Sequence, residues 1–138
     1  MTQQKRVVVG IDGGGTKTRA LLVGFDGTVL AEVTGGASNV QKKGVPEAAE
    51  VFFELILKCA EKAETPHNAI AHVVVGAAGA GRPSTRSELT VAISSLGQKN
   101  KFPLTQVTVE TDARIALEAA FPGRPVIALI AGTGSIAL

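Results

Sequence analysis

One stretch near the start of the chain decides the fold: Val7-Val8-Val9-Gly10-Ile11-Asp12-Gly13-Gly14-Gly15-Thr16-Lys17-Thr18. The apolar run at its beginning predicts a buried strand, and Asp12 stands at the end of that strand. The consecutive glycines let the backbone turn sharply and bring its N–H groups close to an anion. Thr16 and Thr18 add hydroxyl donors, and Asp12 can hold a metal ion through water. This stretch therefore predicts a loop that binds the phosphates of a nucleotide.

A plain β-hairpin explains part of the same pattern, because Gly-Gly between two hydrophobic runs is a strong turn signal. The two interpretations are compatible, since a hairpin can also cradle a phosphate, but a turn alone leaves the flanking Asp12 and Thr16 unexplained. A Walker-type P-loop is excluded because its spacing is absent and because residues 17–25 have strand character where that motif has a helix. We expect the phosphate to sit between two strands.

Composition narrows the class of protein. The 138 residues fit one domain, and 45% apolar with 19% charged residues indicates a globular protein. A net charge of +2 and only five aromatic residues argue against a nucleic-acid partner. No apolar stretch is long enough to cross a membrane and no signal-peptide pattern precedes the first strand, so we expect no membrane partner and a cytoplasmic location. The single cysteine, Cys59, excludes an internal disulfide and is expected to pack within a helix.

Strands and helices are expected to alternate along the rest of the chain. The apolar patterns predict strands at about 6–12, 18–25, 28–34, 70–77, 106–110 and 126–131, and helices at about 46–63, 84–96 and 112–120. Three hairpin strands followed by strand–helix units predict a mixed α/β sheet with helices on both faces. Thr85 and Glu88 are expected to form a capping box at the start of the second helix.

Three motifs in this order resemble those of a known superfamily: Asp12-Gly13-Gly14-Gly15-Thr16-Lys17, Thr111-Asp112-Ala113 and Ala131-Gly132-Thr133-Gly134-Ser135. The superfamily contains acetate kinase, sugar kinases, Hsp70 and actin. Within it the chain is most similar to the BadF/BadG/BcrA/BcrD ATPase family, which includes N-acetylglucosamine and glucosamine kinases. The resemblance implies two ribonuclease H-like domains with the active site in the cleft, the first having a mixed five-stranded sheet in the order 3-2-1-4-5.

The end of the sequence fits this arrangement. Leu138 closes an apolar segment that directly follows a glycine-rich turn, whereas domains usually end in polar residues. We expect an N-terminal ribonuclease H-like ATPase domain at residues 1–123 and the first strand of a second, similar domain at residues 124–138. The unpaired apolar strand could join a second copy of the chain, so a homodimer is possible.

The resemblance also implies roles for single residues. The first ATP phosphate loop would consist of Gly13, Gly14, Gly15, Thr16 and Lys17, with Asp12 near a Mg²⁺ ion that it holds through water. The second phosphate loop would consist of Gly132, Thr133 and Gly134. Asp112 would be the catalytic base at the sugar hydroxyl, and the sugar pocket would include Asn39, Gly79 and Ser135.

Chemistry alone supports part of this assignment. Phosphoryl transfer needs positioned phosphates, Mg²⁺ and an acid oriented toward the attacking hydroxyl. Asp112 stands between a strand end and a helix start, where an N-cap is the structural alternative, although a capping carboxylate can still face a cleft. Arg82, which follows a glycine-rich loop, could reach an anion, but a solvated loop side chain is the preferred interpretation.

We therefore expect ATP- and Mg²⁺-dependent phosphorylation of a hydroxyl on an amino sugar (N-acetylglucosamine or glucosamine) or a related hexose, with the fragment itself inactive. Ile136 stands where animal-type N-acetylglucosamine kinase has an asparagine, which leaves the sugar open. Two alternatives stay open as well. One is an ATPase that activates a 2-hydroxyacyl-CoA dehydratase or benzoyl-CoA reductase, although such activators bridge an iron–sulfur cluster with cysteines and Cys59 fits that role poorly. The other is a nucleotide-binding module without phosphoryl transfer.

Overall fold

Five strands form one mixed sheet in the computed structural model, which describes residues 6–112. The strands are β1 (Val7–Gly13), β2 (Thr18–Gly24), β3 (Val29–Gly35), β4 (Ile70–Ala77) and β5 (Val107–Glu110). Their spatial order is β3-β2-β1-β4-β5, which confirms the predicted topology. The first three strands pair antiparallel as two hairpins, whereas β4 is parallel to β1 and β5 is parallel to β4.

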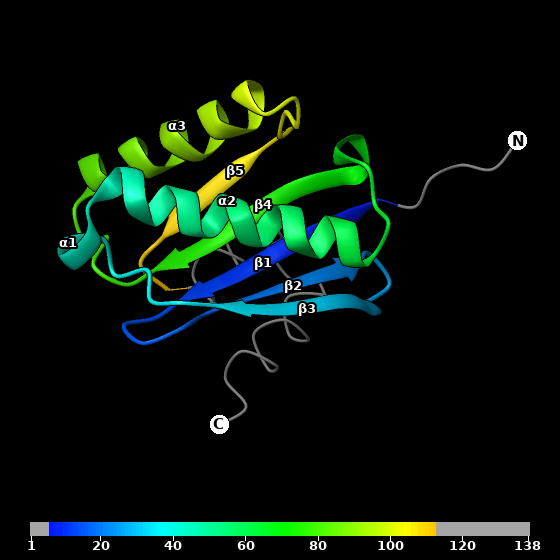
Figure 1. Ribbon diagram of the computed structural model, residues 1–138, viewed down its shortest axis with the longest axis horizontal. Helices are drawn as coiled ribbons and strands as arrows, with labels where there is room; N and C mark the ends of the chain where they lie inside the picture. Colours follow the sequence, from blue (N-terminus) through cyan, green and yellow to red (C-terminus); the bar gives the residue numbers. More distant parts are fainter. Residues whose placement is uncertain (1–5, 113–138) are drawn as a thin grey trace, which may run out of the picture.

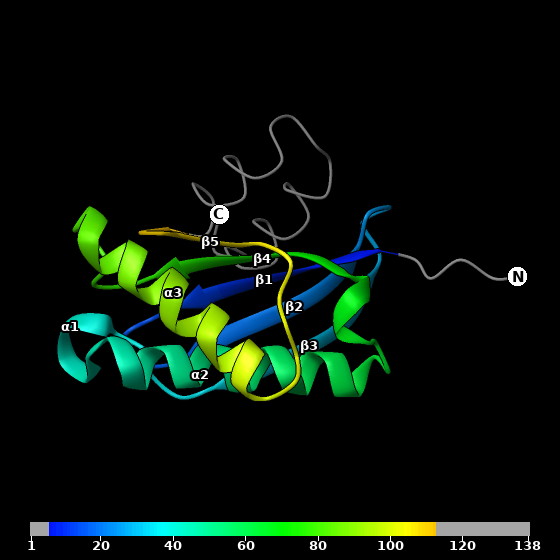
Figure 2. The ribbon, with the colours of Figure 1, turned by 90° about the horizontal axis from the view of Figure 1, so that it is seen from above.

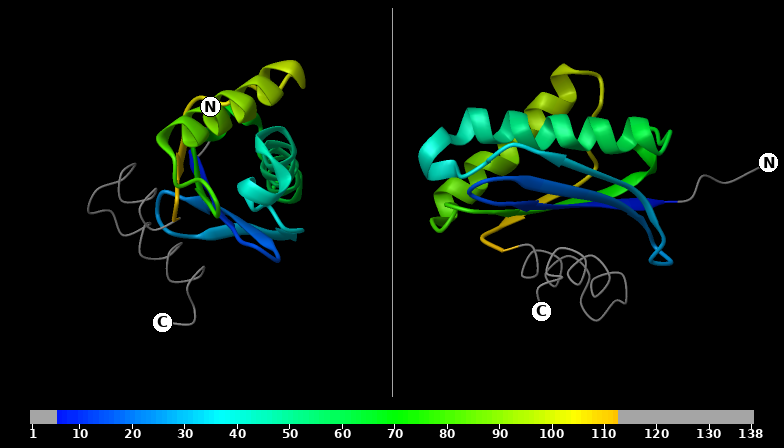
Figure 3. Two further views of the ribbon diagram at one scale, coloured as in Figure 1. Left: turned by 90° about the vertical axis from the view of Figure 1, so that its left-hand side faces the viewer. Right: turned by 60° about the horizontal axis from the view of Figure 1, so that its bottom comes forward.

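Two long helices, α2 (Val45–Lys62) and α3 (Pro83–Lys99), lie side by side on the same face of the sheet (Figures 1 and 2). A short helix, α1 (Val40–Lys43), precedes α2, and a 3-10 turn, η1 (His67–Ala69), leads into β4. Viewed along the strands in Figure 3, the described helices all lie on one side of the sheet. The expected helix at 112–120 and the start of a second domain at 124–138 lie outside the described residues.

Both faces of the sheet carry buried apolar side chains. Alternate residues of β1, among them Val9 and Ile11, face α2 and pack in one core with Phe52 and Ile56. The intervening residue Val8 points to the opposite face and is also fully buried. This pattern is typical of a sheet that is covered on both faces, as the continuous apolar run of β1 predicts.

The start of α2 agrees with the prediction, whereas the start of α3 does not. Pro46 lies in the first turn of α2 as expected, because proline lacks the N–H that would have no partner there. The predicted capping box at α3 is wrong: the helix begins at Pro83 with Arg82 as N-cap, and no side chain caps it. Proline has its φ angle preset for the first turn, so the helix begins before Thr85.

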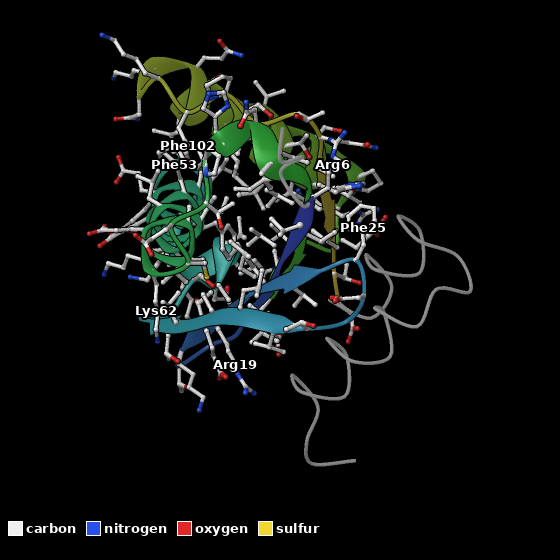
Figure 4. All side chains as sticks on the ribbon, turned by 90° about the vertical axis from the view of Figure 1, so that its right-hand side faces the viewer. Arg6, Arg19, Phe25, Phe53, Lys62 and Phe102 are labelled. Atoms are coloured by element: carbon white, nitrogen blue, oxygen red, sulfur yellow. The ribbon has the colours of Figure 1, made fainter. Side chains whose placement is uncertain are left out.

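An aromatic contact holds the segment that follows α3 against the middle of α2. The rings of Phe53 on α2 and Phe102 after α3 meet edge to face, with centroids 6.4 Å apart (Figure 4).

Cys59 is completely buried in α2, which confirms its predicted packing role. None of the helices described between residues 6 and 112 is long and apolar enough to span a bilayer.

Candidate active site

The carboxyl ends of the three mutually parallel strands meet at one edge of the sheet. Gly13 at the end of β1 is paired with Ala77 at the end of β4, and Gly76 is paired with Glu110 at the end of β5. In Figure 1 these ends lie at the left, beside α1 and the loop between β1 and β2. Ligand sites in open α/β sheets form at this kind of edge. The fold therefore brings the predicted phosphate loop, the glycine-rich loop after β4 and Asp112 into one region.

The loop between β1 and β2 is a tight hairpin. The Gly14 N–H donates to the Lys17 carbonyl at 2.9 Å, and Gly13 pairs with Thr18 across the loop. Gly15, Thr16 and Lys17 are exposed. An open pocket of about 560 Å³ lies next to this hairpin, and the residues that line it are Asp12, Gly14, Thr16, Lys17, Arg19, Glu32 and Thr34. Of the six residues predicted for the first phosphate loop and the metal, four thus share one pocket, while Gly13 is buried and Gly15 faces solvent.

Charged side chains surround Asp12 in this pocket. Arg19 is the residue directly opposite Asp12 in the β1–β2 pairing, and its Nε lies 2.6 Å from an Oε2 atom of Glu32. Figure 4 shows Arg19 on the side of the sheet away from α2. Partial burial raises the pKa of Asp12, the negative charge of Asp112 raises it further, and Arg19 acts in the opposite direction. Asp12 and Asp112 are therefore close enough to repel each other at the same edge of the sheet.

This pair of carboxylates favours the arrival of a cation. Within residues 6–112 no group of three His, Cys, Asp or Glu side chains is placed to hold a metal ion. A Mg²⁺ ion at Asp12 would have to take its other ligands from water and from nucleotide phosphates, which is how Mg²⁺ is usually held in enzymes that act on nucleotides. Asp12 is thus suited to water-mediated or single-carboxylate binding rather than to a closed protein cage.

Thr18 does not serve as a phosphate donor, contrary to the prediction from the sequence. Its side chain is fully buried, its hydroxyl donates to the Gly36 carbonyl at 2.7 Å, and it shares a hydrogen bond with the Ser38 hydroxyl at 2.6 Å. The alternation of β2 explains the error, because Arg19 points to the pocket face and Thr18 must point the other way. Thr16, which is exposed and lines the pocket, is the hydroxyl available to a ligand.

Asn39 and Gly79, the two predicted sugar-binding residues of the described chain, are in direct contact. Gly79 has a φ of +87°, and a Cβ at this position would lie 2.8 Å from Asn39 Oδ1, so only glycine fits. Asn39 Oδ1 caps α1 by accepting from the N–H groups of Gln41 and Lys42 at 3.0 and 3.2 Å. The Asn39 amide nitrogen makes no hydrogen bond to another residue of the described segment.

Backbone hydrogen bonds tie these segments to the hairpin between β1 and β2. The Ala78 N–H donates to the Gly13 carbonyl at 3.0 Å, and the Val40 N–H donates to the Ala78 carbonyl at 3.0 Å. The Ser38 N–H also donates to the Gly14 carbonyl at 3.2 Å. The end of β1, the loop after β4 and the start of α1 therefore form one hydrogen-bonded unit.

Sequence reasoning missed Arg86, which fixes the glycine-rich loop from α3. Its Nη1 donates to the carbonyls of Ala80 and Gly81 at 2.9 and 3.0 Å, and its Nε lies 3.6 Å from Glu110 Oε1. Arg86 thus connects the loop after β4 to the end of β5, two residues before Asp112. An arginine in the first turn of a helix gives no sign in the sequence of such contacts, because both partners come from other elements.

The remaining predicted residues lie at or beyond the end of β5. Asp112 is exposed and lies two residues beyond the end of β5. Gly132, Thr133, Gly134 and Ser135 lie outside the described residues, and so does the helix that Asp112 would cap.

Comparison with known proteins shows the family to which this chain belongs. Residues 9–138 match the BadF/BadG/BcrA/BcrD ATPase family, and the chain belongs to that family. It is 37% identical over 131 residues to the N-acetylmuramic acid/N-acetylglucosamine kinase of Clostridium acetobutylicum, a match that covers 95% of this chain and 41% of that protein. It is 33% identical over 127 residues to the glucosamine kinase GspK of Vibrio cholerae, covering 92% and 41%.

A solved structure shows the same relationship in three dimensions. A Chromobacterium violaceum protein, provisionally described as an N-acetylglucosamine kinase, superposes with a TM-score of 0.61 at 26% identity, covering 89% of this chain and 41% of that one. The family implied by the three motifs and the five-stranded mixed sheet are thus confirmed. The chain spans 41% of the length of the two curated relatives from Clostridium acetobutylicum and Vibrio cholerae. The roles of its single residues are predictions.

Proposed function

We propose that this chain supplies the first ribonuclease H-like domain of a kinase that transfers the γ-phosphoryl group of ATP to a hydroxyl of an amino sugar. The observation that supports it most is the meeting of Asp12, the glycine hairpin and Asp112 at one edge of the sheet. The family and the curated relatives, which are sugar kinases, support the same activity. The proposal assigns residues 1–123 to this domain and residues 124–138 to the start of a second one.

Each part of the reaction has a candidate group. The N–H groups of the hairpin, with Thr16 and Lys17, would bind the phosphates, and a Mg²⁺ ion near Asp12 would neutralise their charge. The amide nitrogen of Asn39 and the backbone at Gly79 would orient the sugar. Asp112 would accept the proton of the attacking hydroxyl as the oxygen forms its bond to phosphorus and the bond to ADP breaks. From the second domain, Gly132, Thr133 and Gly134 would contact phosphate and Ser135 would contact the sugar.

The activator alternative finds no support in the cysteine chemistry of this chain. Cys59 is the one cysteine of the sequence, and it is fully buried in α2. Burial raises the pKa of its thiol to about 11, so the thiolate needed to bind a cluster is disfavoured. This residue is therefore unsuited to bridge a cluster between two subunits.

The decisive experiment is the Asp112→Asn substitution in the full-length protein. We expect kcat with amino sugars to fall about 10²- to 10⁴-fold, the usual worth of a general base, while the Kd for an ATP analogue changes little. Glu88→Gln is the matched control because it removes a carboxylate from the exposed surface of α3. Full turnover by the Asp112→Asn protein would refute the role of the base. A wild-type protein that binds ATP but turns over no amino sugar would favour a module without phosphoryl transfer.

The isolated 138-residue chain is proposed to be inactive, because half of the cleft would be absent. A homodimer through the segment 124–138 is part of the same proposal. Light scattering gives the mass, and an ATPase assay with glucosamine and N-acetylglucosamine gives the activity. A monomer with sugar-stimulated turnover would contradict both statements.

A further inference from the structure

A second pocket begins at Gly79, next to the proposed sugar position. It has a volume of about 300 Å³, and its lining includes Gln41, Gly79, Arg82 and Thr85. Gly79 also touches Asn39, since a Cβ on Gly79 would lie 2.8 Å from Asn39 Oδ1 and 2.9 Å from the Gln41 nitrogen. A sugar held by Asn39 would therefore extend its neighbouring substituents toward this pocket.

The lining of this pocket is cationic. Arg82 is the one charged residue among the described residues that line it, and no carboxylate stands opposite. Arg82 is exposed, and its guanidinium makes no ion pair or hydrogen bond within residues 6–112. Arg86, only one helical turn further on, is by contrast fully occupied by two carbonyls and Glu110. The guanidinium of Arg82 is thus available to a ligand, and the lining also contains the neutral polar residues Thr85 and Gln41.

We propose that this pocket binds a carboxylate carried by the amino sugar, with Arg82 as the residue that selects it. Arginine pairs with a carboxylate through two parallel N–H donors, and such charge-assisted bonds are stronger than neutral ones. The inference rests on the proposed kinase function and narrows its substrate to acidic amino sugars. It distinguishes between the curated relatives, because N-acetylmuramic acid carries a carboxylate, whereas glucosamine carries an ammonium group that Arg82 would repel.

The test compares three sugars in the full-length protein. The kcat/KM values for N-acetylmuramic acid, N-acetylglucosamine and glucosamine are measured for the wild type and for Arg82→Gln. We expect the ratio of the acidic to the neutral sugar to fall about 10- to 100-fold in the variant, the worth of one hydrogen bond to a charged group. Arg82→Lys should lose part of the ratio, because it keeps the charge but not the paired donors. Lys99→Gln, which removes a cation from the far end of α3, should leave the ratio unchanged.

Binding provides the readout that separates this inference from the kinase function. Calorimetry without ATP gives the Kd of N-acetylmuramic acid and of N-acetylglucosamine. Arg82→Gln should raise the Kd of the acid and leave the Kd of the neutral sugar unchanged. An unchanged ratio in Arg82→Gln, or a wild type that prefers glucosamine to the acid, overturns the proposal. A protein that binds the acid through Arg82 but phosphorylates no sugar would support the pocket and contradict the kinase function. Absence of any binding of the acid would overturn the pocket.

Discussion

The hydroxyl oxygens of Thr18 and Ser38 lie 2.6 Å apart inside the protein, although the two residues are 20 positions apart in the chain. Thr18 begins the strand that follows the hairpin proposed to bind phosphate, and Ser38 precedes Asn39 in the segment that would hold the sugar. The same segment is tied to the hairpin by the bond from the Ser38 N–H to the Gly14 carbonyl. The two proposed binding segments are therefore connected by direct contacts and not only by the sheet.

Replacing Thr18 by valine tests how much this buried contact stabilises the fold. Valine keeps the shape of the side chain but leaves the Gly36 carbonyl and the Ser38 hydroxyl without their partner. We expect the free energy of unfolding, measured with urea, to fall by about 1–3 kcal/mol. Thr34→Val is the control, because Thr34 is exposed on β3 and should change stability by about 0.5 kcal/mol or less. Equal losses in both variants would contradict the structural role of Thr18.

The neighbouring glycines of the hairpin should respond differently to alanine. A Cβ on Gly13 would lie 2.7 Å from Ser38 Oγ and 2.8 Å from Phe52 Cε1, whereas a Cβ on Gly15 would meet nothing within 4 Å. Gly13→Ala should therefore lower the free energy of unfolding by about 1–3 kcal/mol through overpacking. Gly15→Ala should leave the melting temperature unchanged but weaken binding of an ATP analogue, if the phosphate approaches the backbone there.

Melting curves and titration calorimetry on the two variants separate these effects. A Gly13→Ala protein as stable as the wild type would mean that Phe52 moves aside without cost. Unaltered nucleotide affinity in Gly15→Ala would show that this part of the hairpin does not contact phosphate.

The sequence predicts the sheet well because local patterns carry the necessary signals. Apolar runs bounded by glycines locate the strands, and Pro46 locates the start of α2. The sequence also places Asp12 at a strand end, and in the structure Asp12 lines an open pocket there. These features depend on residues that are close together in the chain.

Errors arise where a side chain depends on distant partners. Thr18 and Thr16 look equivalent in the sequence, and only the pairing of β1 with β2 turns one inward and leaves the other exposed. Arg86 gives no local signal, because its partners lie in the loop after β4 and at the end of β5. The sequence does not decide where α3 starts, since Pro83 is suited to the first turn of a helix and Thr85 is suited to cap one.

Arg86 provides a test of how the glycine-rich loop is held. Arg86→Gln removes the donors to Ala80 and Gly81 and the charge that faces Glu110. We expect amide hydrogen exchange in residues 78–82 to become about 10-fold faster or more, because bonds from a charged donor are lost. The KM for the sugar should rise with it, since Gly79 belongs to this loop.

Arg82→Gln is the comparison for Arg86→Gln, because it removes an arginine from the same region without removing a described contact. Exchange in residues 78–82 should stay as in the wild type in that protein. Identical exchange in the Arg86→Gln protein and the wild type would show that the loop does not need the arginine.

The raised pKa of Asp12 predicts a cost in stability that the proposed function would explain. Burial and the charge of Asp112 raise this pKa above the ordinary value of 3.8, so the folded state holds the proton at a pH where the unfolded state has lost it. Below the ordinary pKa, Asp12 is protonated in both the folded and the unfolded state, so its titration does not change the free energy of unfolding. This free energy decreases as the pH rises through the window between the ordinary and the raised pKa. Above that window the loss stays constant.

Asp12→Asn should accordingly stabilise the protein at neutral pH in the presence of EDTA. The gain should be about 1 kcal/mol or less, because the group is partly exposed and its charge interactions are screened by solvent. Urea unfolding at pH 7 and near pH 3.5 gives the comparison, and the difference between the variant and the wild type should vanish at the lower pH. Glu88→Gln, on the exposed surface of α3, should show no such pH dependence.

Mg²⁺ with an ATP analogue should make the wild type more stable than Asp12→Asn at neutral pH, because the ligand stabilises only the wild type. A variant that is less stable than the wild type in EDTA at pH 7 would show that the Asp12 charge is favourable in the fold, against the direction of its pKa shift.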